Sequence, residues 1–436
     1  MSAPLSAVAV AEASVPVVVQ QHLDNADVLR SVRSVLVRAP HVGLDRLHRL
    51  DERLAASLDG LAVAGDLGRR MRLAALETPG RGTVFAATVD AIETRDPALL
   101  ERLLSLAQAL PDTLTGLVSA FGWVPAASLR GITQALLGSP HAFRRDVGLA
   151  ACAMHHADPG DALDAAITDP AQAAQAMRVA GKLGRVDLLG ECLRGLSHQA
   201  NEANQDGSMR FASARSALLL GDRHASVRVL AGLAIEAGPC QSAAATLVLK
   251  ALDGMQTDAL LRELARDAGS VRMLVRGMGA AGDPRHVPWL IDRMDDPALA
   301  RLAGESFSAI TGLDLAAADL ELKPPTGPLS GPGSDPRDDP HSDEVAMDED
   351  DALPWPDTAK INDWWQANAS RFPAGGHFFG GEPASPGQCL AVLKSAGQRQ
   401  RIAAAEYLSL MSPGTPLFNT AAPAWRQQWL LSQMEA

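Results

Sequence analysis

The chain has 436 residues, with 51 Asp and Glu against 39 Lys and Arg, so its formal net charge is −12 at pH 7. This balance argues against a protein that coats DNA or an anionic membrane, because attraction to phosphate dominates such binding. The chain is 47% hydrophobic but only 4% aromatic, whereas β-sandwiches and barrels rely on aromatic and β-branched residues. The composition therefore predicts an all-α protein of two or three domains.

The cysteine spacing and the apolar runs indicate in which cellular compartment the protein resides. The four cysteines are widely spaced, with no CxxC pair: Cys152, Cys192, Cys240 and Cys389. This spacing predicts neither a disulfide framework nor a zinc site and is typical of a reducing compartment. The apolar run Ala7–Val19 contains Glu12 and Pro16 and follows no basic region, so we do not expect a signal peptide. No run of 18 apolar residues occurs, and we predict a cytoplasmic protein with no membrane partner.

The regular spacing of leucines in residues 1–80 predicts a helical segment. The leucine stripe consists of Leu44, Leu47, Leu50, Leu54, Leu58 and Leu61. This stripe is out of phase with the helix repeats that follow it in the chain. We interpret residues 1–80 as a terminal cap that shields the next helices from water; a dedicated docking helix is the alternative.

Residues 81–322 contain a repeated pair of helices. In Asp283–Asp296 the apolar side chains follow the i, i+3, i+4, i+7 spacing of an amphipathic helix, and Leu299–Ile310 continues as a second helix. Similar phrases recur around Val186–Leu196, Ala225–Ile235 and Asp258–Leu264. Glycines predicted to end helices recur every 28 to 37 residues, at Gly184, Gly221, Gly254, Gly282 and Gly312. Helix pairs at this period predict an α-solenoid, in which each pair buries its apolar face against its neighbours.

The best-defined unit resembles a HEAT repeat of the short bacterial type. Gly282–Leu290 (Gly-Asp-Pro-Arg-His-Val-Pro-Trp-Leu) is similar to the opening of such a repeat, and Leu299–Gly312 is similar to its second helix. HEAT repeats are scaffolds with many roles. The resemblance therefore implies a fold and leaves the activity open.

The last quarter of the chain consists of two segments that differ in composition. Residues 323–354 are rich in acidic side chains and proline and too poor in apolar surface to offset their ordering entropy, which predicts a linker. Residues 355–436 contain ten aromatic side chains, against seven in the preceding 354 residues. We interpret 355–436 as a small C-terminal helical unit, with a helix pair in Pro386–Leu410 that breaks near Ala396–Gly397.

Several phrases together resemble an uncharacterised family of bacterial HEAT-repeat proteins that is often encoded near type VI secretion genes. They are Leu47–Leu54, Leu58–Leu61, Ser306–Leu315, Leu353–Asp357, Trp364-Trp365, Gly397–Arg401 and Pro413–Trp425. The resemblance covers nearly the whole chain. It implies a secretion-linked, scaffold-like protein and carries no established activity.

Motifs that would carry chemistry are weak. Gly277–Gly282 matches GxGxxG but lacks a preceding strand, so we interpret it as a turn between repeats. His155 and His156, followed by Asp158, point about 100° apart on a helix and cannot chelate as a pair; we expect a helix end. The run Asp348–Asp351 lacks the spaced carboxylates of an EF-hand and predicts a solvated acidic patch. We therefore assign no catalytic, cofactor-binding or metal-binding residue.

Three arginines in the C-terminal unit, Arg371, Arg399 and Arg401, come nearest to a basic cluster. Few other cations surround them, so we interpret them as surface ion-pairing groups and expect no nucleic-acid partner.

Candidate partner-binding residues come from two places. The second helix of each pair lines the concave side of a solenoid, and its polar positions predict a localised positive surface there: Arg228, Arg272, Arg276, Arg301 and Glu305. In this hypothesis an acidic protein partner binds these arginines through its carboxylates; pairing within the array is the alternative. Trp425 and Trp429 are four residues apart on one helix face and form a second candidate anchor.

Three function classes follow. The first is a non-catalytic scaffold or adaptor that holds a protein partner, such as a type VI effector or spike component before export. The second is an immunity-type inhibitor that masks a toxin. The third is an enzyme, by analogy with HEAT-like DNA glycosylases or lyases. A glycosylase requires a basic groove and stacking aromatics, which the repeats lack, so the scaffold is our main prediction.

Overall fold

The computed structural model describes residues 14–197, 207–324 and 349–434. Helices dominate these residues, which confirms the all-α prediction, and the described strands are two residues long each. The described residues form two compact units. Unit 1 takes the described residues within Met1–Val37, Asp45–Leu136 and Ala422–Arg426, and unit 2 takes those within Arg38–Leu44, Leu137–Ala421 and Gln427–Ala436.

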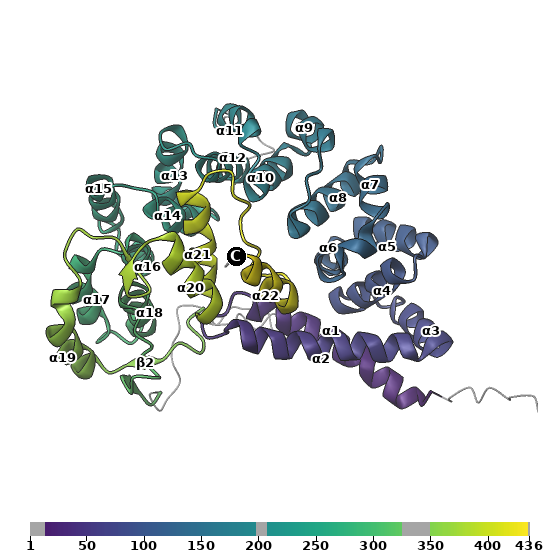
Figure 1. Ribbon diagram of the computed structural model, residues 1–436, viewed down its shortest axis with the longest axis horizontal. Helices are drawn as coiled ribbons and strands as arrows, with labels where there is room; N and C mark the ends of the chain where they lie inside the picture. Colours follow the sequence, from purple (N-terminus) through teal and green to yellow (C-terminus); the bar gives the residue numbers. More distant parts are fainter. Residues whose placement is uncertain (1–13, 198–206, 325–348, 435–436) are drawn as a thin grey trace, which may run out of the picture. The chain divides into compact units, whose positions relative to one another are not determined.

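Unit 1 contains nearly all residues of the first seven helices (Figure 1). These helices are α1 (Pro16–Leu36), α2 (Leu44–Val63), α3 (Gly65–Ala75), α4 (Arg81–Glu93), α5 (Pro97–Ala109), α6 (Leu114–Trp123) and α7 (Ile132–Leu137). The leucine stripe on α2 faces the core, since Leu47, Leu54 and Leu61 are fully buried. Asp51 is also fully buried, and its carboxylate accepts hydrogen bonds from Arg33 Nε at 2.6 Å and the Ala424 amide at 2.7 Å. These bonds satisfy a charge that would otherwise be costly to bury.

Unit 2 contains the helices that follow. They are α8 (Ala142–His155), α9 (Asp161–Thr168), α10 (Ala173–Leu183), α11 (Leu189–Gly195), α12 (Ser208–Leu219), α13 (Ala225–Ile235), α14 (Gln241–Leu249), α15 (Gly254–Leu264), α16 (Val271–Ala281), α17 (Val287–Arg293), α18 (Ala300–Thr311), α19 (Thr358–Asn368), α20 (Pro386–Ser395) and α21 (Gln398–Met411). The last helix, α22 (Ala424–Gln433), contributes residues to both units.

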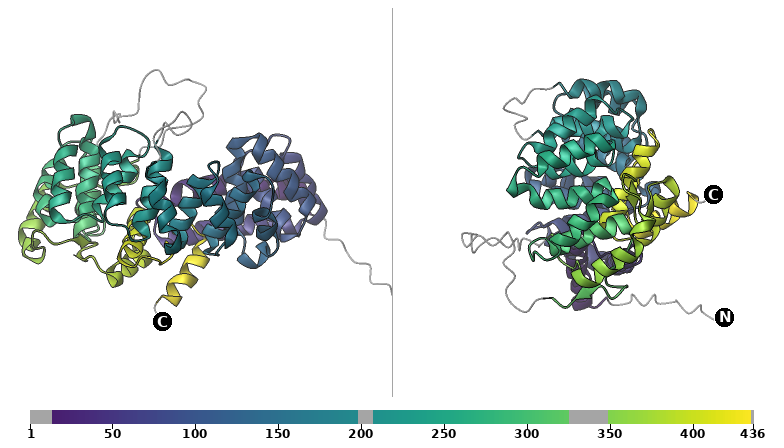
Figure 2. Two further views of the ribbon diagram at one scale, coloured as in Figure 1. Left: turned by 90° about the horizontal axis from the view of Figure 1, so that it is seen from above. Right: turned by 90° about the vertical axis from the view of Figure 1, so that its left-hand side faces the viewer.

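Helices α9 to α18 of unit 2 form two rows. Each odd-numbered helix packs on the next even-numbered one, and α10, α12, α14, α16 and α18 also pack on one another in order. We call α9, α11, α13, α15 and α17 the odd row and the other five the even row. In Figure 2 the teal and green helices of these rows stand side by side.

The predicted core positions of the best-defined repeat are correct. Val287 and Leu290 on α17 are fully buried, as are Leu302, Phe307 and Ile310 on α18. They form one apolar cluster, which Trp365 and Phe372 of the C-terminal segment also join. The aromatic residues of the C-terminus therefore complete the core of the last helix pair.

Four of the five predicted helix-ending glycines end helices of the even row. Gly184, Gly221, Gly282 and Gly312 all have positive φ values, between 67° and 111°, a conformation that glycine adopts without strain. Gly254 is the exception and corrects the prediction. It is the first residue of α15, because the Asp253 side chain caps the helix start by accepting a hydrogen bond from the Gln256 amide.

The C-terminal segment of unit 2 crosses these helix ends. The Phe378 amide donates to the Gly282 carbonyl at 2.8 Å, the Gly380 amide to Ala309 at 2.7 Å, and the Leu417 amide to Lys182 at 2.8 Å. These bonds satisfy carbonyl groups that a helix leaves unpaired at its C-terminus. Helices α20 and α21, with the predicted break between them, then run beside the even row (Figure 1).

The four segments predicted from the sequence do not coincide with the two units. Residues 355–421 belong to the same unit as α8 to α18, because the aromatic core and the carbonyl-capping bonds join them. Strand β1 (Glu321–Leu322) pairs antiparallel with β2 (Trp355–Pro356), so the two flanks of the predicted linker meet. A second hairpin consists of β3 (Phe378–Phe379) and β4 (Glu382–Pro383). Most of the predicted linker, residues 325–348, lies outside the described residues.

Candidate acidic-segment binding site

Four of the predicted partner-binding residues lie together on two neighbouring helices of the even row. Arg272 and Arg276 are one turn apart on α16, and Arg301 and Glu305 are one turn apart on α18. The positions between them, such as Leu274 and Val275, point into the core. The i, i+4 spacing therefore places all four polar side chains on the surface of the even row. We call Arg272, Arg276 and Arg301 the arginine strip.

The arginine strip holds an acidic segment of the same chain, Glu349–Asp350. Arg272 Nη2 donates to both carboxylate oxygens of Asp350 at 2.8 Å, and Arg276 Nη2 donates to the Glu349 carboxylate at 3.0 Å. Arg301 Nη1 donates to the backbone carbonyl of Asp350 at 2.9 Å. The strip thus contacts both the side chains and the backbone of two consecutive acidic residues.

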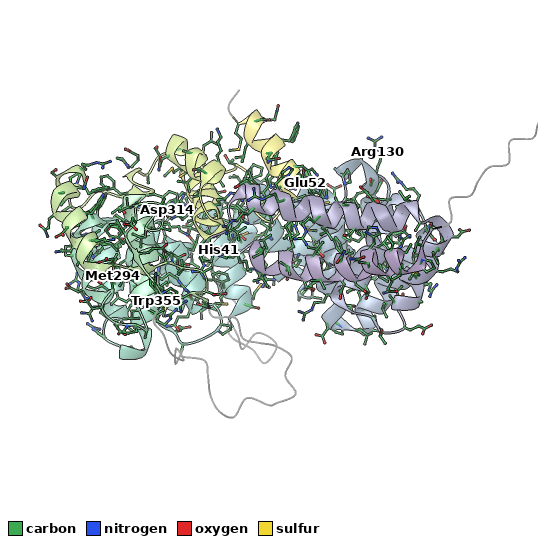
Figure 3. The ribbon with its side chains drawn as sticks, turned by 90° about the horizontal axis from the view of Figure 1, so that it is seen from below. His41, Glu52, Arg130, Met294, Asp314 and Trp355 are labelled. Atoms are coloured by element: carbon green, nitrogen blue, oxygen red, sulfur yellow. The ribbon has the colours of Figure 1, made fainter. Side chains whose placement is uncertain are left out.

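Asp350 corrects the prediction of a solvated acidic patch. It is only 3% exposed, because arginine side chains replace its water shell with charge-assisted hydrogen bonds. The predicted linker boundary at Pro354 also lies later than in the structure, since the chain is held from Glu349 onward. Trp355, labelled in Figure 3, lies under Arg301 with 5.0 Å between the guanidinium carbon and the ring centre.

Arg399 on α21 completes the site and was not recognised as part of it from the sequence. Its guanidinium donates to the Glu305 carboxylate at 2.8 Å and to the backbone carbonyl of Glu349. Burial raises the pKa of Glu305, against the opposing effect of Arg399. The hydrogen bond from Arg276 lowers the pKa of Glu349 below its usual range. Arg399 lies almost a hundred residues after Glu305 in sequence, so local spacing gave no signal of their contact.

An open cavity of about 480 Å³ adjoins the acidic segment. We call it the inner cavity. Small side chains of the even row, such as Thr246 on α14, Gly279 on α16 and Ala309 on α18, line one side, and α21 contributes Ala403 and Tyr407. Charged residues also line it: Arg38, Lys250, Arg276, Arg399, Glu305, Glu349 and Glu406. Its volume falls in the usual range of ligand-binding pockets.

A second charged cluster lies at the inner cavity, with residues from the C-terminal cap of α14, from α12 and from α21. Lys250 Nζ is 2.5 Å from one oxygen of Glu406, and an Arg215 Nη atom is 3.7 Å from the other. Burial disfavours the Glu406 carboxylate, but the two cations outweigh it and lower its pKa. The next residue, Tyr407, donates its hydroxyl hydrogen to the Ala280 carbonyl at 2.8 Å. This cluster therefore fastens α21 to the even row.

The remaining candidates lie elsewhere, and Arg228 corrects the predicted positive surface. Arg228 is on α13, in the odd row, because α13 is the first helix of its pair. There it lines a groove with residues of α15 and is exposed. Trp425 belongs to unit 1, where its ring packs edge to face on Trp123 with 4.7 Å between the ring centres. Trp429 belongs to unit 2 and is 60% exposed.

Arg401 contradicts its interpretation as a surface group. It is fully buried, and its guanidinium donates to the Leu393 carbonyl at 2.7 Å and to the side-chain oxygens of Gln398 and Gln427. Burial lowers its pKa to about 10. These neutral acceptors hold α20, α21 and the first turn of α22 together, so Arg401 has a structural role.

The histidine motif lies at a helix end, as expected, whereas the glycine motif corrects its prediction: the segment interpreted as a turn between repeats is helical up to Ala281. Gly277–Ala281 lies inside α16, and Gly282 is its C-cap residue. His156 is the C-cap of α8 with a φ of 53°, and its Nε2 is 3.0 Å from the Leu417 carbonyl. Gly279 and Ala280 of the glycine motif line the inner cavity, whereas His156 is not among its lining residues.

Comparison with models of protein families, with curated proteins and with solved structures found no match. In the part of the chain that the structure describes, no helix has both the length and the apolar character needed to cross a membrane.

Proposed function

We propose that the protein is a non-catalytic scaffold that binds an acidic segment of a protein partner on the even row of unit 2. The observation that carries this proposal is the contact between the arginine strip and Glu349–Asp350. Arginines from α16, α18 and α21 converge on two consecutive acidic residues and bind their carboxylates and backbone carbonyls. A surface with these donors suits an acidic segment of another protein equally well, because the forked guanidinium matches a carboxylate.

The architecture supports a binding role. In this proposal the two rows of helices form an α-solenoid of HEAT-like pairs, in which each pair is stabilised by its neighbours and the surface of one row is left for recognition. The buried positions of α17 and α18 agree with such stacking. Side chains such as Arg272 and Arg276 are not needed for the apolar core, and in this proposal a partner segment replaces the chain's own Glu349 and Asp350 on them.

The class of partner is proposed from the sequence resemblance. It suggests a type VI effector or spike component bound in the bacterial cytoplasm, with the protein as adaptor. An immunity-type inhibitor of a toxin would use the same acidic-segment chemistry. The two differ in stoichiometry and consequence, because an immunity protein abolishes the activity of one toxin and an adaptor leaves its cargo active.

The test uses a fluorescein-labelled peptide with the sequence of residues 349–356, added to the full chain. In the wild type the chain's own acidic segment competes for the arginine strip. We expect the double variant Glu349→Gln, Asp350→Asn to bind the peptide about tenfold more tightly than the wild type, because its own segment no longer carries charge. Fluorescence anisotropy at low and physiological salt measures both affinities.

Two further variants control this experiment. Adding Arg272→Glu and Arg276→Glu to the double variant must abolish the gain, since the peptide then meets like charge. Arg262→Glu, on the exposed side of α15, must leave it unchanged. If the double variant does not bind the peptide, or if Arg262→Glu is as damaging as the strip variants, the proposal is wrong.

A further inference from the structure

The inner cavity has more cationic than anionic side chains along its lining. Three of its four cations already pair with its three carboxylates: Lys250 with Glu406 at 2.5 Å, Arg276 with Glu349 at 3.0 Å, and Arg399 with Glu305 at 2.8 Å. The fourth cation is Arg38. Its side chain has no ion pair or hydrogen bond with any residue in the described ranges 14–197, 207–324 and 349–434, and it is exposed.

Arg38 is held in place by its backbone. It belongs to the loop between α1 and α2 that is part of unit 2. The Gln398 amide, at the start of α21, donates to the Val42 carbonyl of this loop at 2.9 Å. Gly397 packs so closely on the Pro40 carbonyl that a Cβ atom there would clash with it. The loop is therefore fixed against α21, and a guanidinium on a fixed loop loses less entropy when it binds a ligand.

The acidic segment connects the arginine strip to this cavity. Glu349 lines the inner cavity, whereas Asp350, the next residue, is buried beside Arg272 and Arg301 and does not line it. A partner segment that binds the strip in the same direction would place its acidic pair on the arginines. The residues before that pair would then lie over the inner cavity, toward its unpaired cation.

We propose that the inner cavity is a second recognition position for the same acidic partner segment, which takes a carboxylate side chain from upstream of the acidic pair and binds it through Arg38. This inference rests on the proposed function. It adds a sequence preference: the partner segment carries an acidic pair and, within a few residues before it, one further Asp or Glu. The small side chains of α14, α16 and α18 leave the room for that side chain, and the excess positive charge selects its sign.

A peptide series tests this. Each peptide carries the sequence of residues 349–356 after four alanines, and in successive peptides one of these alanines is replaced by glutamate. Affinities are measured for the Glu349→Gln, Asp350→Asn background with and without Arg38→Gln. We expect at least one glutamate peptide to bind about fivefold or more tightly than the all-alanine peptide, and Arg38→Gln to remove that gain while leaving the affinity of the all-alanine peptide unchanged.

The outcomes separate the two proposals. If no peptide binds at all, the proposed function fails. If all peptides bind equally, or if the gain survives Arg38→Gln, the acidic-segment function stands and the inner cavity is not a recognition position. Ala403→Phe gives an independent steric check, because a ring at this cavity-lining position must also remove the gain. Arg262→Gln serves as the charge-matched control on α15 and must not.

Discussion

Two charged clusters on the even row of unit 2 use the same chemistry in different surroundings. In the Lys250–Arg215–Glu406 cluster, every side chain is at most 18% exposed, and the carboxylate belongs to helix α21. In the arginine strip, the Glu349 side chain is 67% exposed and belongs to a short segment outside any helix. The first cluster therefore joins a helix to the even row, whereas the second joins a short non-helical segment to it through one exposed carboxylate, Glu349, and one buried carboxylate, Asp350.

The largest effect on stability is expected from a substitution that breaks the buried cluster. Glu406→Ala leaves Lys250 and Arg215 facing each other without their shared carboxylate, and we expect a loss of roughly 2–4 kcal/mol in the free energy of unfolding. Glu349→Ala removes a carboxylate that water solvates well, and we expect a loss below about 1 kcal/mol. Urea denaturation followed by circular dichroism measures both. Equal losses would remove the distinction between the two clusters.

We expect a pH dependence of the stability, of intermediate size, from His377, which lies beside the buried cluster. Tyr407 donates its hydroxyl hydrogen to Ala280, so His377 Nε2, 2.9 Å from the hydroxyl oxygen, must be the donor in their hydrogen bond. Burial lowers the pKa of His377, against the opposing charge of Asp283. The folded chain therefore favours the neutral ring. Its contribution to stability is complete above the ordinary histidine pKa of about 6.5 and is lost as the pH falls through the lower, folded value.

His377→Gln should therefore reduce the loss of stability on going from pH 7.5 to pH 5, compared with the wild type. His141→Gln, at the exposed start of α8, is the matched control and should leave the pH profile unchanged. Unfolding free energies at several pH values test this. Identical slopes for the wild type and His377→Gln would show that the ring does not titrate differently in the folded chain.

The smallest expected effect on stability, with a clear local signature, concerns the acidic segment. The double variant Glu349→Gln, Asp350→Asn should lose about 1–2 kcal/mol in the free energy of unfolding, because Asp350 is buried while Arg272 keeps some contact with water. The amides of residues 349–354 should also exchange hydrogen faster. In the wild type, acidification should release the segment in the same way. The hydrogen bond from Arg276 lowers the pKa of Glu349, so the ion pair between them persists at pH values above the ordinary carboxylate pKa. It is lost as the pH falls through the lower pKa of the folded chain. Unchanged exchange of 349–354 in the double variant would mean that other contacts hold the segment.

The helices and their buried faces could be predicted from the sequence because both follow from local periodicity. The stripe through Val287 and Leu290 specified which side of α17 enters the core, and the spacing of Arg272 and Arg276 placed them on the even-row surface. What pairs with those arginines depends on residues 349–350 and 399, more than 70 positions away. No spacing rule connects positions so far apart, so the sequence did not predict that the chain's own acidic segment binds the arginine strip.

Arg401 and Arg228 are two further residues whose environment could not be predicted from the local sequence. Arg401 stands near Arg399 in sequence, and both were interpreted as surface groups, but Arg401 faces the contact between α20, α21 and α22 and is fully buried. Arg228 resembles the strip arginines in type and is on α13, in the odd row. In both cases the residue type did not indicate the environment. The burial of Arg401 depends on α20 and α22, and the location of Arg228 depends on which helix of its pair carries it.

The pairing of β1 with β2 has a consequence for any partner. Because Trp355 pairs with Leu322, Glu349 and Asp350 remain tethered a few residues from the arginines even when they are released. Short flexible tethers give effective concentrations in the millimolar range. A free acidic segment must therefore outcompete a ligand that is always present at that concentration. An acidic pair alone would bind weakly, and only a partner with a second point of attachment would occupy the surface at cellular concentrations.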